Sequence, residues 1–396
     1  MKKQLLCTSA IALGVAAAPA AAQDWNLDWG GFFNTHVAVS DISTNLTDGQ
    51  DFDGDGLDVH TNTEIIFTPS ITLDNGLTFG VNIQFEGSNT ESSEIDESYA
   101  SISSDTFGRL DVGAENSAGY KLMTGAPSVT SMFINSPSTS TFIPFTATGT
   151  EGNFRQAFLS SFTEVGGNND VNRITYYTPD FNGLTIGVSY APTGDINVGN
   201  SLSVDKRQVV SDIFDIGVNY SGSFGTTDVT LAARYGTGDA ATFETTGATA
   251  GGDGLDGTSD DTDGTIGAIA TPASDPETWG IGASVTFGAV TVGGSYSEND
   301  NGAADGDGDQ EGWSFGVVYD AAGPWAFEAL TYQGEIKGTG ADGDLDREAY
   351  KIGASRDLGP GVDWDIYLVY EERDFEGTAG TEVEGTTLGT AINLSF

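Results

Sequence analysis

Carboxylate side chains are the groups of this sequence best placed to do chemistry, because several of them are closely spaced. Asp51, Asp53, Asp55 and Asp58 alternate with glycine and apolar residues. Carboxylates at this spacing can wrap a hard cation such as Ca²⁺. The segment resembles the start of an EF-hand loop, but Asn62 stands where that loop needs a bidentate glutamate, and no helical pattern flanks it. Two interpretations therefore stay open, a calcium site and a solvated acidic rim.

Enzymatic chemistry is poorly represented in the rest of the chain. His36 and His60 are the two histidines, and Cys7 is the single cysteine. No Gly-x-Ser-x-Gly motif, zinc-ligand pattern or phosphate-binding loop occurs in a convincing context. We therefore predict a protein that is not an enzyme and requires no cofactor.

The charge balance limits the kinds of molecule that the protein can bind. The formal net charge is −44, from 58 acidic and 14 basic residues. Such a surface repels nucleic acid, so no nucleic-acid partner is expected. It suits a salty medium, bound cations or the transport of cations.

The first residues have the pattern of a secretory signal. Lys2 and Lys3 precede a short apolar run, and Ala20 to Ala22 form a small-residue cleavage site. The run is too short for the roughly 20 residues that a membrane-spanning helix needs. We predict a cleaved signal peptide at residues 1–22 and a single mature domain at residues 23–396.

The mature domain repeats an alternating pattern with a period of two, which is typical of strands with one apolar face. The pattern is clearest in the last residues, where Leu388 to Phe396 alternate apolar with small or polar side chains. Sixteen such segments begin near Leu27, Leu57, Leu77, Glu94, Arg109, Val171, Leu184, Phe214, Val229, Trp279, Val290, Trp313, Trp325, Tyr350, Val362 and Leu388. An even number of strands with one at the very end of the chain predicts an all-β fold. We expect a closed antiparallel transmembrane β-barrel of about sixteen strands.

The connections support a membrane barrel over a soluble sandwich. Short turns, such as Asp74-Asn75-Gly76, alternate along the chain with long acidic segments. Outer-membrane barrels have short periplasmic turns on one rim and long external loops on the other. Many apolar faces also end in tryptophan or tyrosine, as at Trp279, Tyr296 and Trp313, which is typical of aromatic girdles. The predicted location is the outer membrane of a Gram-negative cell.

Three parts of the chain resemble a known family. Tyr99 to Gly113 (YASISSDTFGRLDVG), Asn172 to Tyr190 (NRITYYTPDFNGLTIGVSY) and the terminal Phe396 are similar to the general diffusion porins of Gram-negative bacteria, particularly those of alphaproteobacteria. The resemblance implies a homotrimer of barrels, each with its own aqueous pore, and a loop after the fifth strand that folds inward. It also implies that Phe396 is recognised by the barrel-assembly machinery, and that outer-membrane lipid and lipopolysaccharide surround the barrel.

The candidate constriction lies in and around the long segment from Ala114 to Asp170. By resemblance, charged loop residues face basic residues on the wall, although the acidic PEFGG-type motif of such loops is missing here. The candidate constriction residues are Glu115, Lys121, Glu151, Arg155 and Glu164 in or beside the loop, and Arg109, Arg173 and Arg234 on the wall. An arginine facing lipid at mid-membrane would cost ~2–4 kcal/mol, which favours a pore-facing position for the wall arginines.

The function implied by the resemblance is passive diffusion of ions and small hydrophilic solutes through a water-filled channel. Because acidic residues far outnumber basic ones, we expect cation selectivity. Two alternatives stay open, an outer-membrane barrel enzyme such as a lipid hydrolase and a structural or adhesive barrel without an open pore. Conductance in planar bilayers separates these alternatives from a porin.

Overall fold

The computed structural model describes residues 24–44, 53–87, 95–135, 142–145, 155–194, 204–246, 265–268, 274–302, 308–338, 343–375 and 382–396. The predicted signal peptide falls outside these ranges and stays a prediction. The strands are β1 (Asn26–Thr44), β2 (Gly56–Thr72), β3 (Thr78–Glu86), β4 (Ile95–Ser104), β5 (Gly108–Glu115), β6 (Val171–Tyr177), β7 (Leu184–Thr193), β8 (Ser211–Phe224), β9 (Thr227–Asp239), β10 (Phe243–Thr246), β11 (Thr265–Ala268), β12 (Glu277–Phe287), β13 (Val290–Asp300), β14 (Gln310–Asp320), β15 (Trp325–Ile336), β16 (Leu345–Gly359), β17 (Val362–Phe375) and β18 (Val383–Ser395). The helices are α1 (Ala118–Leu122) and the 3₁₀ turns η1 (Val165–Gly167) and η2 (Lys206–Gln208).

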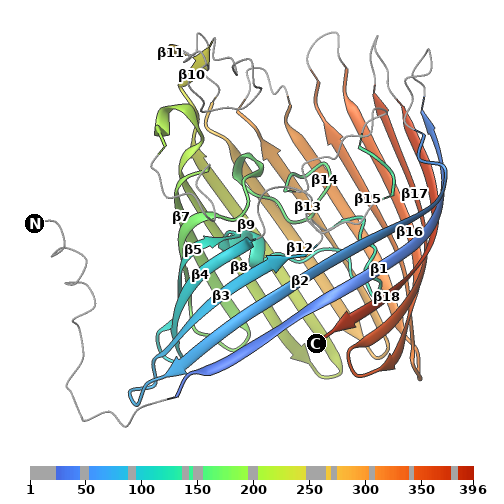
Figure 1. Ribbon diagram of the computed structural model, residues 1–396, viewed down its shortest axis with the longest axis horizontal. Coiled ribbons are helices and arrows are strands. Elements are labelled where there is room, and N and C mark those ends of the chain that lie inside the picture. The colour runs from blue at the N-terminus through green and yellow to red at the C-terminus, as the bar shows by residue number, and fades with distance from the viewer. Residues whose placement is uncertain are drawn as a thin grey trace, which may run out of the picture.

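Sixteen of the described strands form one closed antiparallel barrel, which confirms the predicted fold class. Each strand pairs with its neighbour in sequence, except that β9 pairs with β12 and that β10 and β11 form a separate two-stranded sheet (Figure 1). Closure comes from pairing of β1 with β18, in which Phe33 lies opposite Leu394. The terminal residue completes this seam, because the amide of Gly31 donates to the carbonyl oxygen of Phe396 at 3.0 Å.

The strands carry apolar side chains outward and mainly polar or small side chains inward. On β1 the outward residues Trp29, Phe33 and Val39 are exposed, while the alternate residues His36 and Ser40 are buried. This alternation is what a strand with a period of two produces when lipid covers one face. Among the described residues, no helix is long and apolar enough to span a membrane.

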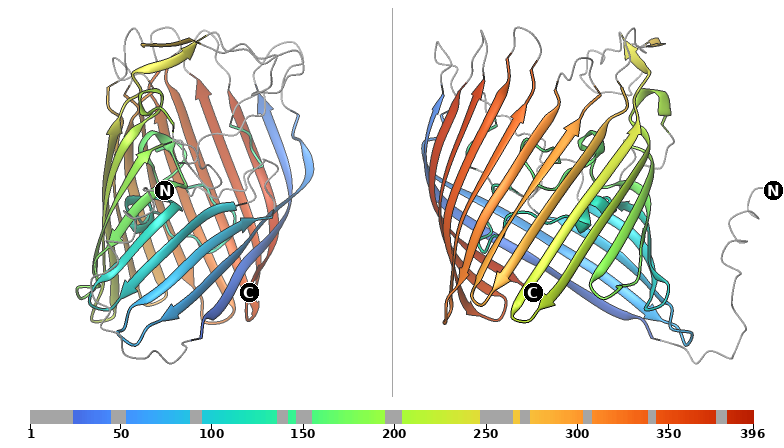
Figure 2. Two further views of the ribbon diagram at one scale, coloured as in Figure 1. Left: turned by 60° about the vertical axis from the view of Figure 1, so that its left-hand side comes forward. Right: turned by 180° about the vertical axis from the view of Figure 1, so that it is seen from behind.

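The wall is uneven in height. Strands β3 to β6 have 7 to 10 residues, whereas β1 has 19 and β2 has 17. The short strands therefore make a low side of the barrel, visible in Figures 1 and 2, and the long strands β1 and β2 lie next to it and run diagonally across the adjoining wall. The segment that follows β5 enters the barrel beside this low side.

Candidate functional site

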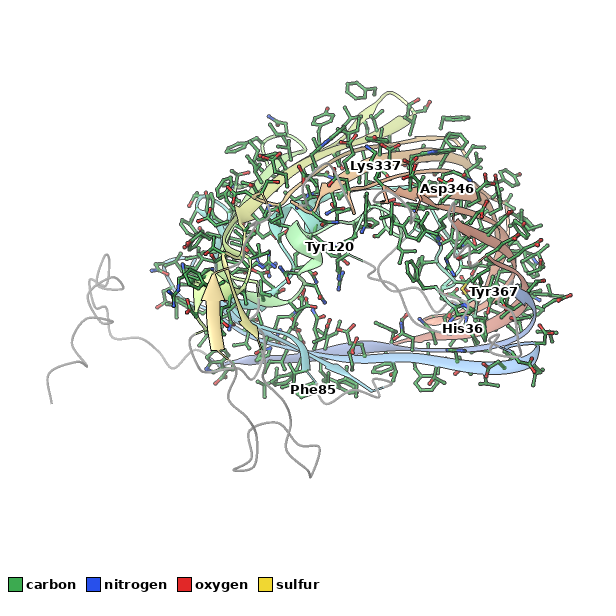
Figure 3. The ribbon with its side chains drawn as sticks, turned by 90° about the horizontal axis from the view of Figure 1, so that it is seen from above. His36, Phe85, Tyr120, Lys337, Asp346 and Tyr367 are labelled. Atoms are coloured by element: carbon green, nitrogen blue, oxygen red, sulfur yellow. The ribbon has the colours of Figure 1, made fainter. Side chains whose placement is uncertain are left out.

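The segment between β5 and β6 lies against the inner wall wherever the structure describes it. The amide of Gly119 donates to Asp215 Oδ1 at 2.9 Å, and the amide of Ala157 donates to Asn299 Oδ1 at 2.8 Å. Asp215 and Asn299 are buried residues of β8 and β13, and Phe214, next to Asp215, is exposed on the outer face. Figure 3 shows Tyr120, from this segment, inside the ring of strands, with open space between it and the wall that carries His36 and Tyr367. We call the segment of residues 116–170 the inner loop.

Charged side chains of the wall hold the backbone of the inner loop. Glu328 accepts the amide of Val129 at 2.6 Å, and Asp365 accepts the amide of Ser131 at 2.8 Å. Arg347 donates to the carbonyl oxygen of Ile134 at 3.1 Å. Buried backbone groups outside regular structure need such partners, and hydrogen bonds to charged groups are the strong ones. These wall charges therefore position the loop.

The helix α1 brings Lys121 to a pair of wall carboxylates. Ser117 caps the helix by accepting the amide of Tyr120. Lys121 Nζ lies 2.8 Å from Glu115 Oε2 and 3.4 Å from Glu97 Oε2. Burial alone would lower the pKa of Lys121, but the carboxylates of Glu115 and Glu97 outweigh burial and raise it. Lys121 is therefore a charged but internally paired group.

Arg155 lies on the return arm of the inner loop. Its guanidinium is 3.7 Å from Asp170 Oδ2 and stacks over the ring of Tyr120, 4.7 Å from the ring centroid. Burial raises the pKa of Asp170 well above its ordinary value, and the neighbouring Asp96 carboxylate raises it further, while Arg155 opposes both effects. The loop and the β4 wall therefore meet at a carboxyl pair beside one arginine.

The three predicted wall arginines all lie on the inner face, each next to a carboxylate. Arg173 is 3.9 Å from Glu164 of the inner loop, and both side chains are buried. Arg234 pairs with Asp215 and is also buried.

Arg109 pairs with Asp111 at 2.7 Å but is different in exposure, because 45% of its side chain is accessible. It lies at the end of β5 next to the short turn before that strand. Arg109, which belongs to the porin-like segment Tyr99 to Gly113, is therefore a paired arginine near one rim of the barrel and not at mid-height.

Pairing extends to most basic residues of the chain. Of 14 lysines and arginines, Lys2 and Lys3 belong to the predicted signal. Among the other twelve, all of which are described, ten lie within 4.0 Å of a carboxylate oxygen. A charge paired at this distance adds little to the field along the lumen.

A group of carboxylates on β2, β3 and β4 was not predicted from the sequence. Glu64 lies opposite Glu86 in the β2–β3 ladder. Their neighbours Ile65 and Phe85 are exposed on the outer face, so the two glutamates point inward. The described charged groups that act on Glu64 are Asp96, Glu97 and Glu86, all of them acidic. We call Glu64, Glu86 and Asp96 the acidic wall.

Two of the predicted site residues, Glu151 and Asp51, fall outside the described ranges. Of the other residues in the acidic segment, Asp55 accepts the amide of Ile42 at 2.7 Å and Asp58 accepts the amide of Val59 at 2.7 Å. In the described part of the chain, no three His, Cys, Asp or Glu side chains are arranged to hold a metal ion. With Asp51 unplaced, the calcium site stays a prediction.

Comparison with known proteins gives the family and the fold. A family model described as "Gram-negative porin" matches residues 8–378. The anion-selective porin from Comamonas acidovorans superposes with a TM-score of 0.58 at 16% identity, covering 94% of this chain and 100% of that one. An OmpT loop-deletion mutant from Vibrio cholerae superposes with a TM-score of 0.59 at 12% identity, covering 94% and 99%. OmpT of Vibrio cholerae in its trimer form gives 0.57 at 11% identity, covering 94% and 99%. No curated protein matches the chain in sequence.

Proposed function

Because the chain belongs to the Gram-negative porin family and forms an outer-membrane barrel, we propose that it is a cation-preferring channel for passive diffusion of ions and small hydrophilic solutes. A barrel of this size encloses an aqueous lumen unless its interior is filled. The inner loop takes up part of the lumen, and open space remains between Tyr120 and the wall that carries His36 and Tyr367 (Figure 3). Such a channel needs fixed charges and water, and no catalytic group or cofactor.

The observation that carries the cation preference is the acidic wall. The charged groups that act most strongly on Glu64 and Asp96 are carboxylates, and Arg155 is the basic group acting on Asp96. The other basic groups at this height, Lys121 and Arg173, are each already paired with a carboxylate. Carboxylates near a narrow, water-filled path attract cations and exclude anions. The proposed cation preference is opposite to that of the anion-selective porin from Comamonas acidovorans, with which this chain shares the fold alone.

We also propose a homotrimer as the assembly. The support is the outer face of β1 and β2, which carries exposed apolar side chains near the end with the long loops. There Val39 is 52% exposed, Leu57 71% and Val59 53%. Replacement of Leu57 by Asp should release monomers in detergent, as read by light scattering, and unchanged trimers would move the interface elsewhere. The other proposed partners are outer-membrane lipid, lipopolysaccharide and, through Phe396, the barrel-assembly machinery.

Planar-bilayer recording tests the function directly. Single channels are recorded in symmetric KCl, and the reversal potential is then measured across a tenfold KCl gradient. Stepwise conductance with a reversal potential of the sign for K⁺ supports the proposal, whereas anion preference would overturn the role of the acidic wall. Absence of conductance by folded protein would favour a structural or adhesive barrel, and release of fatty acid from added phospholipid would favour a lipid hydrolase.

A further inference from the structure

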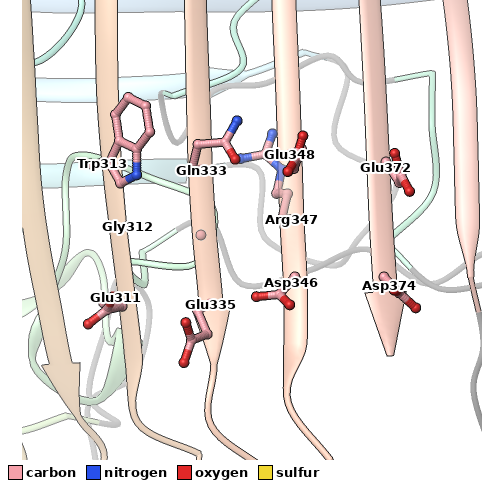
Figure 4. A pocket seen from close by; sticks show the side chains of 11 residues that line it. Glu311, Gly312, Trp313, Gln333, Glu335, Asp346, Arg347, Glu348, Glu372 and Asp374 are labelled. Carbon is pink, nitrogen blue, oxygen red and sulfur yellow. The ribbon is translucent and has the colours of Figure 1, made fainter. Parts of the chain in front are cut away.

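The outer wall over β14 to β17 carries opposite charges at its two ends. At the long-loop end the outward charged side chains are carboxylates, which Figure 4 shows in two rows: Glu311, Glu335, Asp346, Glu348, Glu372 and Asp374. Tyrosine hydroxyls donate hydrogen bonds to three of them, Glu311, Glu348 and Glu372. At the short-turn end, the described outward residues of these strands include a single charged side chain, Arg356 on β16.

Arg356 lies on the lipid-facing side of the wall, close to the short-turn rim. Residues that differ by an even number of positions along a strand share a face. Ile352, four positions before Arg356 on β16, is 58% exposed on the outer face, so Arg356 also points outward. Three positions later, β16 ends at Gly359. The guanidinium therefore lies near the edge of the apolar belt.

Two tryptophans flank Arg356 on the neighbouring strands. Trp325 of β15 and Trp364 of β17 lie directly opposite it in the strand ladder. The Cζ atom of Arg356 is 5.5 Å from the centroid of the Trp325 ring, and the two indole rings are 5.9 Å apart. Trp364 is held in place, because its Nε1 donates to Thr390 Oγ1 at 2.7 Å. Tryptophans on a membrane protein's outer face mark the depth of the lipid head groups, so the guanidinium lies at that depth.

Arg356 has neither an ion pair nor a hydrogen bond to any described residue. Of the twelve basic residues after the predicted signal, ten lie within 4.0 Å of a carboxylate oxygen, and the other two are Arg356 and Lys337. The Nε atom of Arg356 is buried without a hydrogen-bond partner. The ring of Trp325 attracts the cation but supplies no oxygen acceptor. Charge complementarity therefore calls for an anionic occupant that offers oxygen atoms at the head-group depth.

An apolar groove continues from Arg356 toward the middle of the membrane. The groove has a volume of about 450 Å³, and its lining includes Ile352. Between the groove and Arg356 lies Ala354, which stands opposite Phe327 and Ile366 in the ladder. The methyl group of Ala354 is shorter than either neighbour and, at ~3.4 Å per residue, lies about 7 Å from Arg356 along the strand. One molecule can therefore place an anionic group at Arg356 and a hydrocarbon chain over Ala354.

We propose that Arg356 binds the phosphodiester group of one phospholipid from the leaflet on the short-turn side, with an acyl chain over Ala354 and in the groove. The planar guanidinium can donate from two nitrogens to two phosphate oxygens, a geometry that a lysine cannot offer. The ring of Trp325 holds the cation from one side. This site lies on the outer face, so the inference is independent of the proposed ion preference of the channel.

Native mass spectrometry of the full chain in detergent tests the proposal. Wild type and Arg356→Gln are titrated with dioleoylphosphatidylglycerol, and separately with dioleoylglycerol, which has the same chains and no phosphate. We expect Arg356→Gln to weaken the first binding step of the phospholipid about fivefold, the equivalent of one partly exposed ion pair. Dioleoylglycerol should bind both proteins alike. Arg356→Lys keeps the charge without the fork of donors and should lie between wild type and Arg356→Gln. Ala354→Phe should weaken both lipids, because it fills the path of the chain.

Matched controls separate the site from general effects of charge and bulk. Lys337→Gln removes the other basic residue that has no carboxylate within 4.0 Å, and it lies just after the long-loop end of β15. Ala283→Phe adds the same bulk to the outer face of β12. Both variants should bind the phospholipid as the wild type does.

Four results would overturn the proposal. The first is wild-type binding of the phospholipid by Arg356→Gln, and the second is an equal loss in Lys337→Gln, which would indicate an effect of net charge alone. The third is displacement of the phospholipid by millimolar glycerol 3-phosphate, which would assign Arg356 to soluble phosphate esters. The fourth is a change of oligomer mass in Arg356→Gln with lipid binding unchanged, which would assign this surface to a second copy of the chain. Should Arg356→Gln not fold, Arg356→Lys and Ala354→Phe decide by the same measurement.

Discussion

Two regions of the inner wall use carboxylates in opposite ways. Beneath the inner loop, Asp215, Glu328 and Glu371 each contact a basic side chain, and the first two also accept amides of the loop. On the acidic wall, the charged groups that act on Glu64 among the described residues are all carboxylates. In the first arrangement the carboxylates are neutralised by basic side chains and position the inner loop. The second leaves net charge beside the path, so the two regions should respond differently to the same kind of substitution.

The largest expected effect is on stability, in the paired region. Arg234→Met would leave Asp215 buried without its cation, and breaking a buried pair from one side costs about 3–5 kcal/mol. We expect this loss of unfolding free energy in urea titrations of the protein in lipid vesicles. The double variant Asp215→Asn with Arg234→Met should recover much of the loss, because no lone charge remains. An equally large loss in the double variant would mean that packing against the loop, and not charge, is what matters here.

The next effect is on selectivity, at the acidic wall. Glu64→Gln with Glu86→Gln should lower the K⁺ to Cl⁻ permeability ratio about fivefold while leaving stability near wild type, since like charges are removed. The reversal potential in a KCl gradient measures the ratio. Glu372→Gln with Glu384→Gln removes two carboxylates that face each other on the outer face, and it should leave the ratio unchanged. Equal shifts in both variants would show that total charge, and not position, sets selectivity.

A smaller effect is expected at the rim. Asp53, Asp55 and Asp58 lie near the long-loop end of β2, away from the acidic wall. Replacing all three by asparagine should reduce cation preference less than twofold at 0.1 M KCl, where the screening length is about 10 Å, and hardly at all at 1 M, where it is about 3 Å. A reduction that persists at 1 M would place these side chains closer to the path than the rim.

The smallest expected effect concerns calcium at the same segment. If Asp51 joins the other carboxylates as a calcium loop, 1 mM CaCl₂ should raise the melting temperature of the wild type by a few degrees relative to EDTA, through binding to the folded state. The asparagine variant should show no such rise. Identical melting with calcium and with EDTA in the wild type would leave a solvated acidic rim as the interpretation.

The sequence was sufficient to predict the barrel. Each strand has lipid on one face and the lumen on the other, so its apolar and polar side chains alternate with a period of two. The segments predicted from Trp325 and Leu388 are confirmed as β15 and β18, and the alternation also gave the inner or outer side of Arg173 and Arg234. Glu64 was missed because Ile65, Ile66 and Phe67 interrupt the alternation just after it. Its partner Glu86 lies on the next strand, and their meeting depends on the register of the ladder.

The hydrogen bonds between the inner loop and the wall could not be predicted from the sequence. Gly119 meets Asp215 across 96 residues, and Ser131 meets Asp365 across 234. No periodicity relates such positions, because an irregular segment has no repeating direction for its amides. The composition shows that acidic residues outnumber basic ones, but it does not show which acidic side chains are paired with a basic side chain.

The seam between β1 and β18 has a consequence for how the molecule is made. The amide of Phe396 donates to the carbonyl oxygen of Gly31 at 3.2 Å, so the first and last strands of the barrel meet in one hydrogen-bonded pair. The approach is close, because a methyl group at Gly30 would lie 2.8 Å from the carbonyl oxygen of Phe396. Contacts between such distant residues are the slowest to form. The hydrogen-bonding edge of the first strand therefore stays open until the last strand has formed, and an open edge of this kind can pair with a strand of another chain.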